Sequence, residues 1–210
     1  MVDDHPILRD GFAQLIGQES DLKVCGEADT ATKALTAIAA LKPDLVIVDI
    51  SLKGVSGIEL IKRIKLSHPE VPVLVLSVQD EAVFAERSLR AGARGYVMKQ
   101  APTEEVMAAI RRVLRGGHYL SRKMQERLLD NLSAGSEGGS APGIECLSDR
   151  ELEVFRLVGR GCGTRQIAEQ LRLSIKTIET YRAHIKEKLK LRNGIELIRS
   201  AIKISEEQRY

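Results

Sequence analysis

Three carboxylates, a hydroxyl and an ammonium group stand at positions where they could form one polar site. Asp3 and Asp4 lie at the start of the chain, and Asp49 closes an apolar run. Ser77 and Lys99 follow two later apolar runs. Carboxylates gathered in one crevice repel one another unless a divalent cation neutralises them, and oxygen ligands of this kind suit Mg²⁺. The residue types therefore predict a Mg²⁺ site that also accepts a small anion.

The same residues are suited to phosphoryl transfer. One carboxylate can act as a nucleophile and become an aspartyl phosphate, while the metal and Lys99 stabilise the moving charge. A hydroxyl such as that of Ser77 can then hydrogen-bond a phosphoryl oxygen. Tyr96 lies on the strand that leads to Lys99, and we expect its side chain to move when the phosphoryl group arrives.

The longer, N-terminal part of the chain alternates short apolar runs with helical patterns. Runs rich in Val, Leu and Ile predict buried strands at residues 22–28, 45–50, 71–77 and 95–98. Apolar residues at i, i+3 and i+4 predict helices at residues 7–16, 34–41, 58–66, 82–89 and 106–114. This alternation is typical of a doubly wound α/β domain with a parallel sheet, which binds ligands at the carboxyl ends of its strands. Asp49, Ser77 and Lys99 fall at those ends.

The C-terminal part shows a series of capped helices. Ser148 and Glu151 form a capping-box pattern that starts the first helix. Thr164 is expected to cap a second helix, and Ser174 a third that reaches about Leu189. A helix, a tight turn and another helix within about twenty residues form the helix-turn-helix layout. We therefore predict a small all-α domain that binds DNA.

The third of these helices has two different faces. At about 100° per residue, Ile175, Ile178 and Ile185 fall on one side with Leu189, and we expect that side to be buried. Small and polar residues on the other side would let the helix approach base edges. Residues 176–192 carry six basic and two acidic side chains, a local net charge of +4 that suits phosphate contacts. The expected DNA-binding residues are Thr164, Arg165, Ser174, Lys176, Thr177, Glu179, Thr180, Arg182, Ala183, Lys186 and Lys188.

A stretch at residues 133–144, SAGSEGGSAPGI, divides the chain. It is too poor in large apolar side chains to order itself, so it predicts a flexible linker. Residues 1–144 hold 18 Lys and Arg against 19 Asp and Glu, a net charge of −1, and residues 145–210 hold 14 against 10, a net charge of +4. We predict a phosphoacceptor domain at residues 1–117, a linker helix and flexible linker at residues 118–144, and a basic DNA-binding domain thereafter.

Several classes of protein do not fit the sequence. No apolar run approaches the roughly 18 residues that a membrane helix needs, and acidic residues follow Met1 too closely for a signal peptide. We therefore expect a cytoplasmic protein with no membrane partner. Cys25, Cys146 and Cys162 are scattered and lack CxxC spacing, which argues against a disulfide framework and a zinc site.

The N-terminal part resembles the receiver domain of two-component response regulators, which has a flavodoxin-like fold. The resemblance extends from residue 2 to about residue 115 and rests on DDHP at the start, LVIVDI around Asp49, Ser77, and GYVMK before Gln100. It implies that Asp49 is the phosphoacceptor and that a sensor histidine kinase is the phosphodonor.

The receiver resemblance also implies roles for the other site residues. Mg²⁺ would be held by Asp3, Asp4 and Asp49 together with the backbone carbonyl of Ser51. Lys99 would pair with the phosphoryl group. Ser77 and Tyr96 would form the switch pair that remodels the surface near the fourth helix and fifth strand.

Residues 147–193 resemble the LuxR-type DNA-binding domain, and the helix that follows fits it to about residue 204. With the receiver in front, the chain resembles the NarL/FixJ-family response regulators over almost its whole length. This resemblance implies a transcriptional regulator that binds promoter DNA as a homodimer, a role compatible with contact to RNA polymerase. The dimerisation candidates are on the apolar stripe of the last helix, at Ile195, Ile198 and Ile202, which also includes Ala201.

One feature departs from the receiver pattern. A receiver has a whole buried strand before its acidic pair, in the middle of a 2-1-3-4-5 sheet, whereas here Met1 and Val2 stand in its place. The first strand is therefore expected to be truncated. The sequence leaves open whether residues before Met1 are absent from it, whether the receiver is degraded, or whether another chain completes it.

Two other functions share parts of the pattern. A phosphorylation-independent DNA-binding regulator would use a degenerate receiver for dimerisation alone, which the truncated strand favours and the full set of site residues opposes. An aspartyl-phosphate phosphatase would share the nucleophile and Mg²⁺, but such enzymes commonly need a second acid two residues after the nucleophile, where Ser51 stands. We therefore expect a regulator and not an enzyme.

Overall fold

A computed structural model describes residues 1–52, 55–133 and 144–207 of the chain. The chain divides into two compact units, Met1–Ser136 and Glu137–Tyr210, and each is described by itself. The flexible linker predicted at residues 133–144 lies almost entirely outside the described residues. Within the described ranges, no helix is both long enough and apolar enough to span a bilayer.

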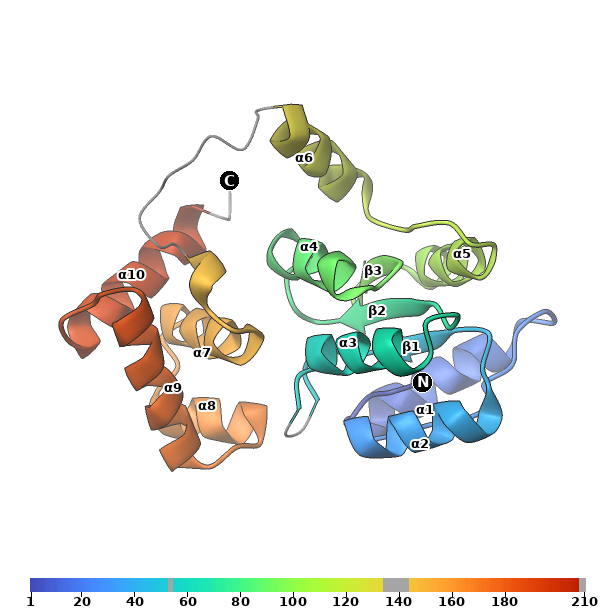
Figure 1. The fold of residues 1–210 in the computed structure, drawn as a ribbon, viewed down its shortest axis with the longest axis horizontal. Coiled ribbons are helices and arrows are strands. Elements are labelled where there is room, and N and C mark those ends of the chain that lie inside the picture. Colours follow the sequence, from blue (N-terminus) through green and yellow to red (C-terminus); the bar gives the residue numbers. More distant parts are fainter. Residues whose placement is uncertain (53–54, 134–143, 208–210) are drawn as a thin grey trace. The chain divides into compact units, whose positions relative to one another are not determined.

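The first unit is built on a parallel sheet of three strands (Figure 1). In spatial order these are β1 (Val46–Val48), β2 (Val73–Ser77) and β3 (Gly95–Met98). The helices are α1 (Pro6–Gly17), α2 (Ala31–Leu41), α3 (Gly57–Ser67), α4 (Glu81–Ala91) and α5 (Thr103–Leu114). Apolar side chains of α1 and α5 pack with those of the three strands in one core cluster. The α/β fold predicted from the alternation of patterns is confirmed.

The central strand that the receiver pattern requires is reduced to one residue. Val2 forms isolated parallel bridges with Ala28 on one side and Val48 on the other, so the expected sheet order is kept at this position. Backbone N–H to carbonyl hydrogen bonds of 2.8–3.0 Å hold the bridges, from Val2 to Ile47, from Asp49 to Val2, from Ala28 to Met1 and from Asp3 to Ala28. The order and register of the sheet are therefore kept at this position by four backbone hydrogen bonds.

The regular strand predicted at residues 22–28 is wrong. In this segment Ala28 alone makes a bridge, and residues 22–27 have no regular secondary structure. A strand persists only when a neighbour supplies ladder hydrogen bonds. Among the described residues Met1 and Val2 alone stand beside this segment as a strand would, and the amino group of Met1 donates to the carbonyl of Gly26 at 2.8 Å. Residues 22–25 therefore have no ladder to join.

Side chains cap α2 and α4 at their starts. Thr30 accepts a hydrogen bond from the amide of Lys33 at the start of α2, and Asp80 accepts one from Ala82 at the start of α4. Each bond satisfies a backbone donor that has no partner inside the helix. α4 ends at Gly92 with φ of 114°, a left-handed conformation that glycine adopts without strain.

A sixth helix, α6 (Arg122–Ser133), belongs to the same unit and is held to α4. Glu81, in the first turn of α4, accepts hydrogen bonds from the amide of Ser121 at 2.9 Å and from its hydroxyl. The Ser121 hydroxyl in turn accepts from the amide of Met124 at 3.2 Å, and the Met124 side chain is buried. The predicted linker helix is thus joined to the first unit through side-chain hydrogen bonds at its start.

The second unit is helical. It contains a short 3-10 helix, η1 (Ile144–Cys146), followed by α7 (Asp149–Gly159), α8 (Thr164–Leu171), α9 (Ile175–Lys188) and α10 (Gly194–Glu207). Its core is formed by buried apolar side chains from all four α-helices, among them Leu152, Phe155, Ile167, Ile178, Ile185 and Leu197. The predicted helix-turn-helix, α8 and α9, is confirmed.

Caps in the second unit agree with the sequence at two helices and differ at one. Ser148 and Glu151 form the predicted capping box, and Ser174 accepts from the amide of Thr177. The prediction that Thr164 caps α8 is wrong, because Gly163 is the N-cap and its amide donates to the side chain of Gln166 at 2.8 Å. The Gln166 side chain supplies half of a capping box, which needs no hydroxyl at the cap.

The predicted buried side of α9 is partly wrong. Ile178 and Ile185 are fully buried, but Ile175 is 44% exposed. Helical periodicity gives the direction in which a side chain points, not whether a neighbour lies opposite it. Ile175 is the first residue of α9, and its direction alone does not bring it into the core.

Candidate functional site

The three predicted carboxylates lie together at the carboxyl end of the sheet. Asp49 directly follows β1, and its amide donates to the carbonyl of Val2 at 2.9 Å. Asp3 and Asp4 follow Val2, the residue that bridges the end of β1. All three side chains are buried. Oxygens of these carboxylates and Nδ1 of His5 lie within 4.8 Å of one another, a spacing suited to one metal ion.

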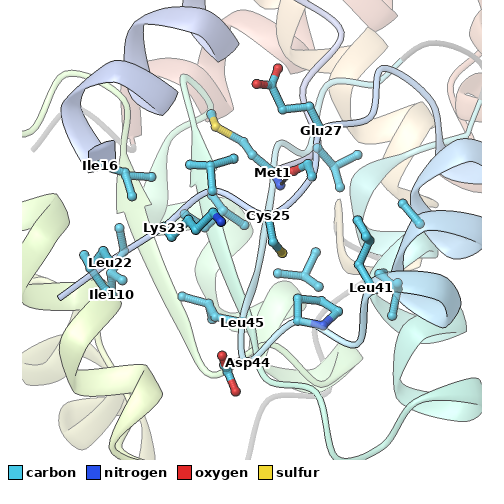
Figure 2. Close-up of a pocket in the computed structure, with 18 of the residues that line it drawn as sticks. Met1, Ile16, Leu22, Lys23, Cys25, Glu27, Leu41, Asp44, Leu45 and Ile110 are labelled. Atoms are coloured by element: carbon cyan, nitrogen blue, oxygen red, sulfur yellow. Dashed lines mark hydrogen bonds between the residues drawn. The ribbon is translucent and has the colours of Figure 1, made fainter. Parts of the chain in front are cut away.

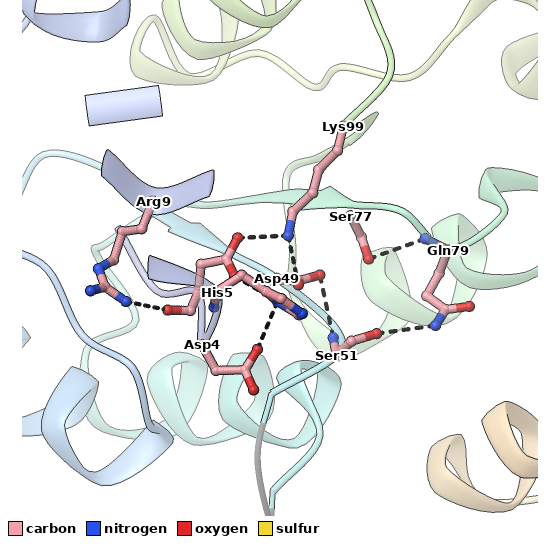
Figure 3. Close-up of polar contacts among 9 residues, drawn as sticks. Asp4, His5, Arg9, Asp49, Ser51, Ser77, Gln79 and Lys99 are labelled. Atoms are coloured by element: carbon pink, nitrogen blue, oxygen red, sulfur yellow. Dashed lines mark hydrogen bonds and ion pairs between the residues drawn. The ribbon is translucent and has the colours of Figure 1, made fainter. Parts of the chain in front are cut away.

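Lys99 completes the cluster from the end of β3 (Figure 3). Its Nζ lies 2.6 Å from Oδ2 of Asp3 and 2.8 Å from Oδ2 of Asp49, and its side chain is buried. Burial by itself lowers the pKa of Lys99, but the charge of Asp49 and the hydrogen bonds to both carboxylates outweigh burial, so the net pKa is raised. The lysine is therefore held as an ammonium beside the Asp49 carboxylate.

The donor set fits a divalent cation. Three buried carboxylates face one ammonium group, and a charge imbalance of this kind in a buried site favours a bound cation. Carboxylate oxygens are the hard ligands that Mg²⁺ prefers. The amide of Ser51 donates to Oδ1 of Asp49 at 3.3 Å, so this residue lies next to the carboxylate as the predicted ligand set requires.

The two residues of the predicted switch pair lie beside the carboxylates. Ser77 is buried at the end of β2, and its Oγ accepts from the amide of Gln79 at 3.3 Å. Tyr96 is also buried, and its hydroxyl donates to the carbonyl of Gln79 at 2.8 Å. Burial, followed by the charge of Asp49, raises the pKa of Tyr96 well above its ordinary value. Ser77 and Tyr96 are thus both bound to Gln79.

Three further residues belong to the site, although the sequence does not indicate them. Gln79 donates from its side chain to Oγ of Ser51 at 3.0 Å and so joins the loops after β1 and β2. Arg9 donates to the carbonyl of Asp3 at 2.8 Å and pairs with Glu27 at 2.7 Å. Gly57 lies against the backbone of Asp49, where a Cβ would collide. Gln79 could have been suspected from its place two residues after Ser77, but Arg9 and Gly57 carry no such signal.

The predicted DNA-binding residues of α9 are mostly open to solvent. Lys176, Glu179, Thr180 and Ala183 are exposed, as the helical period predicts for one face. The hydroxyls of Ser174 and Thr177 lie 2.7 Å apart. At the start of α8, Arg165 is exposed and Thr164 is half-buried. Three residues of α9 are also half-buried: Thr177, Arg182 and Lys186. The open face of the helix is therefore polar, with small side chains near its middle.

Lys188 has a different environment from the other basic residues of α9. Its Nζ lies 2.6 Å from Oε2 of Glu151, and Nδ1 of His184 lies 3.7 Å from the other oxygen of the same carboxylate. Hydrogen bonds from Lys188 and Ser148 hold the pKa of Glu151 below its usual value, although its burial acts in the opposite direction. Lys188 thus joins α9 to α7 in the free protein.

The dimerisation candidates form an apolar stripe on α10. Ile195, Ile198 and Ile202 are 64%, 40% and 39% exposed. Ala201, which the sequence places on the same stripe, is buried in the core. Large exposed aliphatic side chains in a row are typical of surfaces that bind a partner.

Comparisons with known proteins agree with both units. Residues 1–111 match the family described as response regulator receiver domain, and residues 145–201 match bacterial regulatory proteins of the luxR family. The oxygen regulatory protein NreC of Staphylococcus aureus is 34% identical over 207 residues, which cover 97% of this chain and 95% of that protein. The match spans both units.

Solved structures give the same assignment. One of the RcsB response regulator of Salmonella typhimurium is 29% identical, with a TM-score of 0.64 over 97% of this chain and 95% of that one. Another, of RcsB bound to the promoter rprA in the presence of the phosphomimetic BeF3−, is 30% identical with a TM-score of 0.60 over 95% of each chain. The chain therefore belongs to the NarL/FixJ-family response regulators, the DNA-binding transcriptional regulators of two-component systems that join a receiver domain to a LuxR-family helix-turn-helix domain.

Proposed function

We propose that Asp49 accepts a phosphoryl group from a sensor histidine kinase and that this modification controls DNA binding by the second unit. The observation that carries the proposal is the buried Asp49 carboxylate, which lies beside Asp3 and Asp4 and 2.8 Å from the ammonium of Lys99. A carboxylate in this setting is a nucleophile with a positive group already placed to receive the incoming charge.

In the transfer, an oxygen of Asp49 forms a bond to phosphorus while the bond from phosphorus to the histidine nitrogen of the kinase breaks, and that nitrogen keeps the electron pair. Asp3, Asp4, Asp49 and the carbonyl of Ser51 would hold Mg²⁺. When bound, the ion would neutralise negative charge on the phosphoryl oxygens. Lys99 then exchanges part of its contact with Asp49 for a contact with a phosphoryl oxygen.

The phosphoryl group would be sensed through Gln79. The Ser77 hydroxyl, which accepts from the Gln79 amide, has a hydrogen to donate to a phosphoryl oxygen. A shift of Ser77 toward that oxygen would disturb the loop whose carbonyl holds the Tyr96 hydroxyl. This loop leads directly into α4, to which α6 is bound through Glu81. The change would thus reach the start of α6.

In the second unit, α9 would enter the major groove of promoter DNA. Lys176, Glu179, Thr180 and Ala183 would face the base edges, while Arg182 and Lys186 would contact phosphates. Thr164, Arg165, Ser174 and Thr177 lie near the starts of α8 and α9, where hydroxyls and free amides suit phosphate oxygens. Two copies paired through α10 would bind two half-sites. A regulator of promoters works where the chromosome lies, in the cytoplasm, and RNA polymerase is a further expected partner.

The Asp49→Asn variant tests the proposal. We expect the parent protein to gain the mass of one phosphoryl group from acetyl phosphate with Mg²⁺, and to bind promoter DNA more tightly as a result. Asp49→Asn should show neither effect, because an amide is not a nucleophile of this kind. Asp10→Asn, a change at an exposed carboxyl of α1, is the control and should behave as the parent.

Two outcomes would contradict the proposal. A phosphoryl adduct that persists in Asp49→Asn would assign the acceptor to another residue. Promoter binding by the parent that is the same with and without acetyl phosphate would favour the second candidate function, a phosphorylation-independent regulator whose receiver serves for dimerisation alone.

A further inference from the structure

The imidazole ring of His5 lies against two carboxylates of the candidate cation site (Figure 3). Its Nδ1 is 3.0 Å from Oδ1 of Asp4 and 3.3 Å from Oδ1 of Asp3. The cluster is distinct from the apolar cavity of the same unit, which Ile16 and Ile110 line (Figure 2). The phosphoryl transfer proposed at Asp49 makes no use of the ring, so its place beside the carboxylates calls for a separate explanation.

The backbone of His5 directs the ring to the carboxylates. His5 is the N-cap of α1, and Pro6 follows it at the start of the helix. An N-cap side chain usually accepts a hydrogen bond from an amide of the first turn, but the His5 side chain makes no such bond. Its own amide donates to Oδ1 of Asp3 at 2.9 Å. The backbone and the ring of His5 thus both face the same carboxylate oxygen.

The distances around Nδ1 suit one metal ion. In an octahedral site with bonds of about 2.1 Å, neighbouring ligand atoms are about 3.0 Å apart. The separations of Nδ1 from the oxygens of Asp4 and Asp3, 3.0 and 3.3 Å, are close to this value. One oxygen of Asp49 completes a group of four ligand atoms that all lie within 4.8 Å of one another. Little movement would bring the four atoms around a single ion.

The position between His5 and the carboxylates is separate from that of the Lys99 ammonium. Oδ2 of Asp3 lies 2.6 Å from Nζ of Lys99, whereas Oδ1 of the same carboxylate faces His5. The His5 side chain is 45% exposed, and those of Asp3 and Asp4 are 1% and 3% exposed. The ring therefore stands on the solvent side of the buried carboxylates, where an entering ion would meet it.

We propose that Nδ1 of His5 is a further ligand of the cation held by the three carboxylates, and that it raises the preference of this site for transition-metal ions such as Zn²⁺ and Ni²⁺ over Mg²⁺. Imidazole nitrogen suits these ions, whereas Mg²⁺ favours carboxylate, carbonyl and water oxygens. Because imidazole binds a metal in its neutral form, the ring adds a ligand without adding negative charge. The inference rests on the cation site of the proposed function and adds the class of ion that this site selects.

The effect of His5 is a change in relative affinity. Mg²⁺ and a transition-metal ion would compete for one position, because they share the carboxylate ligands. Oxygen ligands alone also bind different divalent ions with unequal affinity. The contribution of the ring is therefore measured by how much the affinity for each kind of ion falls when the nitrogen is removed.

Two variants of the untagged protein test the proposal. His5→Asn replaces the ring nitrogen by an amide, whose oxygen is a hard ligand, and Asn is a favoured N-cap, so α1 should begin as before. His118→Asn is the matched control, since His118 is an exposed histidine in the segment after α5. Each protein is titrated by calorimetry with Mg²⁺ and, separately, with Co²⁺. Co²⁺ is the probe because it belongs to the same series of ions and because its unpaired electrons shift the NMR signals of its ligands.

We expect His5→Asn to lower the affinity for Co²⁺ by at least roughly tenfold, the loss that even partners outside the ligand shell produce. Its affinity for Mg²⁺ should change by less than about threefold, because that ion gains little from a nitrogen ligand. A strongly shifted, exchangeable N–H signal from a Co²⁺-bound imidazole should appear in the parent and in His118→Asn, and should be lost in His5→Asn.

A fall of the same size for both ions would overturn the proposal, because His5 would then only position Asp3 and Asp4. Co²⁺ affinity that does not fall, or a shifted N–H signal that persists in His5→Asn, would overturn it as well. None of these titrations uses a phosphodonor, so their failure would leave the phosphoacceptor proposal standing. Failure of Asp49 to become labelled would, in turn, leave the measured metal affinities unchanged.

Discussion

Gly57 shows how closely the backbone packs at Asp49. A Cβ at this position would come within 2.6 Å of the Cα of Ile50 and still closer to the carbonyl oxygen of Asp49. Both atoms belong to the backbone that leads from β1 into the site, so neither can move without displacing Asp49. The glycine is required here by a close approach and not by its dihedral freedom.

We predict that Gly57→Ala lowers the free energy of unfolding by about 3 kcal/mol, the upper part of the usual range for overpacking. It should also slow labelling of the protein by acetyl phosphate, because the clash displaces Asp49. Urea unfolding and mass spectrometry measure the two effects. Gly17→Ala is the matched control: a Cβ at Gly17 meets nothing within 4 Å, and the change should cost less than about 1 kcal/mol. Similar losses in the two variants would refute the packing argument.

Glu151 gives the second unit a pH dependence that can be measured. Its carboxylate accepts from Lys188 at 2.6 Å and from the amide of Ser148 at 2.7 Å. Although its burial acts the other way, these contacts hold the pKa of Glu151 below the value of 4.5 expected for a free side chain. A depressed pKa stabilises the fold above the pKa of the unfolded chain and ceases to do so as the pH falls through the folded value.

We therefore expect the parent protein to be more stable than Glu151→Gln at neutral pH, and the difference to shrink as the pH falls below about 4.5. The reason is that the unfolded chain binds the proton more readily than the folded one. Urea titrations at a series of pH values would measure this difference. A difference in the free energy of unfolding that stays constant with pH would show that the carboxylate charge does not contribute.

The positions of the candidate chemical residues could be predicted from the sequence, whereas residues that act through shape could not. Asp49, Ser77 and Lys99 could be predicted because parallel strands bring their carboxyl ends to one edge. Arg9 reaches the site through the carbonyl of Asp3, a backbone contact with no sequence pattern of its own. Gly57 depends on an approach between two backbone segments, which spacing along the chain does not reveal.

At the scale of elements, the hydrogen bonds between Glu81 and Ser121 connect α4 with the start of α6. Glu81 is a single carboxylate that satisfies both the amide and the hydroxyl of Ser121. The hydroxyl, in turn, accepts from Met124 inside α6. The start of α6 is therefore fixed by a residue in the first turn of α4, the helix that follows the loop containing Gln79.

We predict that Glu81→Gln loosens α6, because a neutral amide offers one weaker acceptor in place of two carboxylate oxygens. Amide exchange in residues 122–130 should become several-fold faster, while exchange in β2 should not change. Glu86→Gln is the matched control: Glu86 lies on the same helix and pairs with Arg90 on the surface at 2.6 Å. Faster exchange of α6 in both variants, or in neither, would contradict this role of Glu81.

Helices were predicted more reliably than strands, for a physical reason. A helix satisfies its own backbone, so periodicity alone places α2 and α4 to within a few residues of their ends. A strand depends on its neighbours. The apolar residues at 22–28 are suited to a strand, but among the described residues only Met1 and Val2 pair with them, at Gly26 and Ala28. The burial of a helical side chain also depends on its neighbours. Ile175 is exposed although the apolar pattern of α9 predicts that it is buried, because the pattern does not show where the neighbouring helix ends.

At the scale of the whole molecule, we expect two copies to bind DNA together through α10. We predict that Ile198→Gln weakens binding to a site with two half-sites by roughly tenfold, the effect of losing an apolar contact worth about 1.4 kcal/mol. Binding to a single half-site should not change. Gel shifts on both DNAs measure this, with the change Arg199→Gln at the adjacent exposed residue as control. A loss of the same size on the single half-site would place Ile198 in DNA contact or in the fold, not in the dimer.

The hydrogen bond from the amide of Asp49 to the carbonyl of Val2 links the carboxylate site to the stability of the sheet. Asp3 follows Val2 and Asp49 follows Val48, and Val2 and Val48 form the bridge that joins these two segments. A cation bound by both carboxylates would therefore also hold the two segments together. By thermodynamic linkage, a cation bound there would contribute its binding free energy to folding. A bound cation would thus raise the Tm of the first unit, and the size of that rise would report the fraction of sites that are occupied.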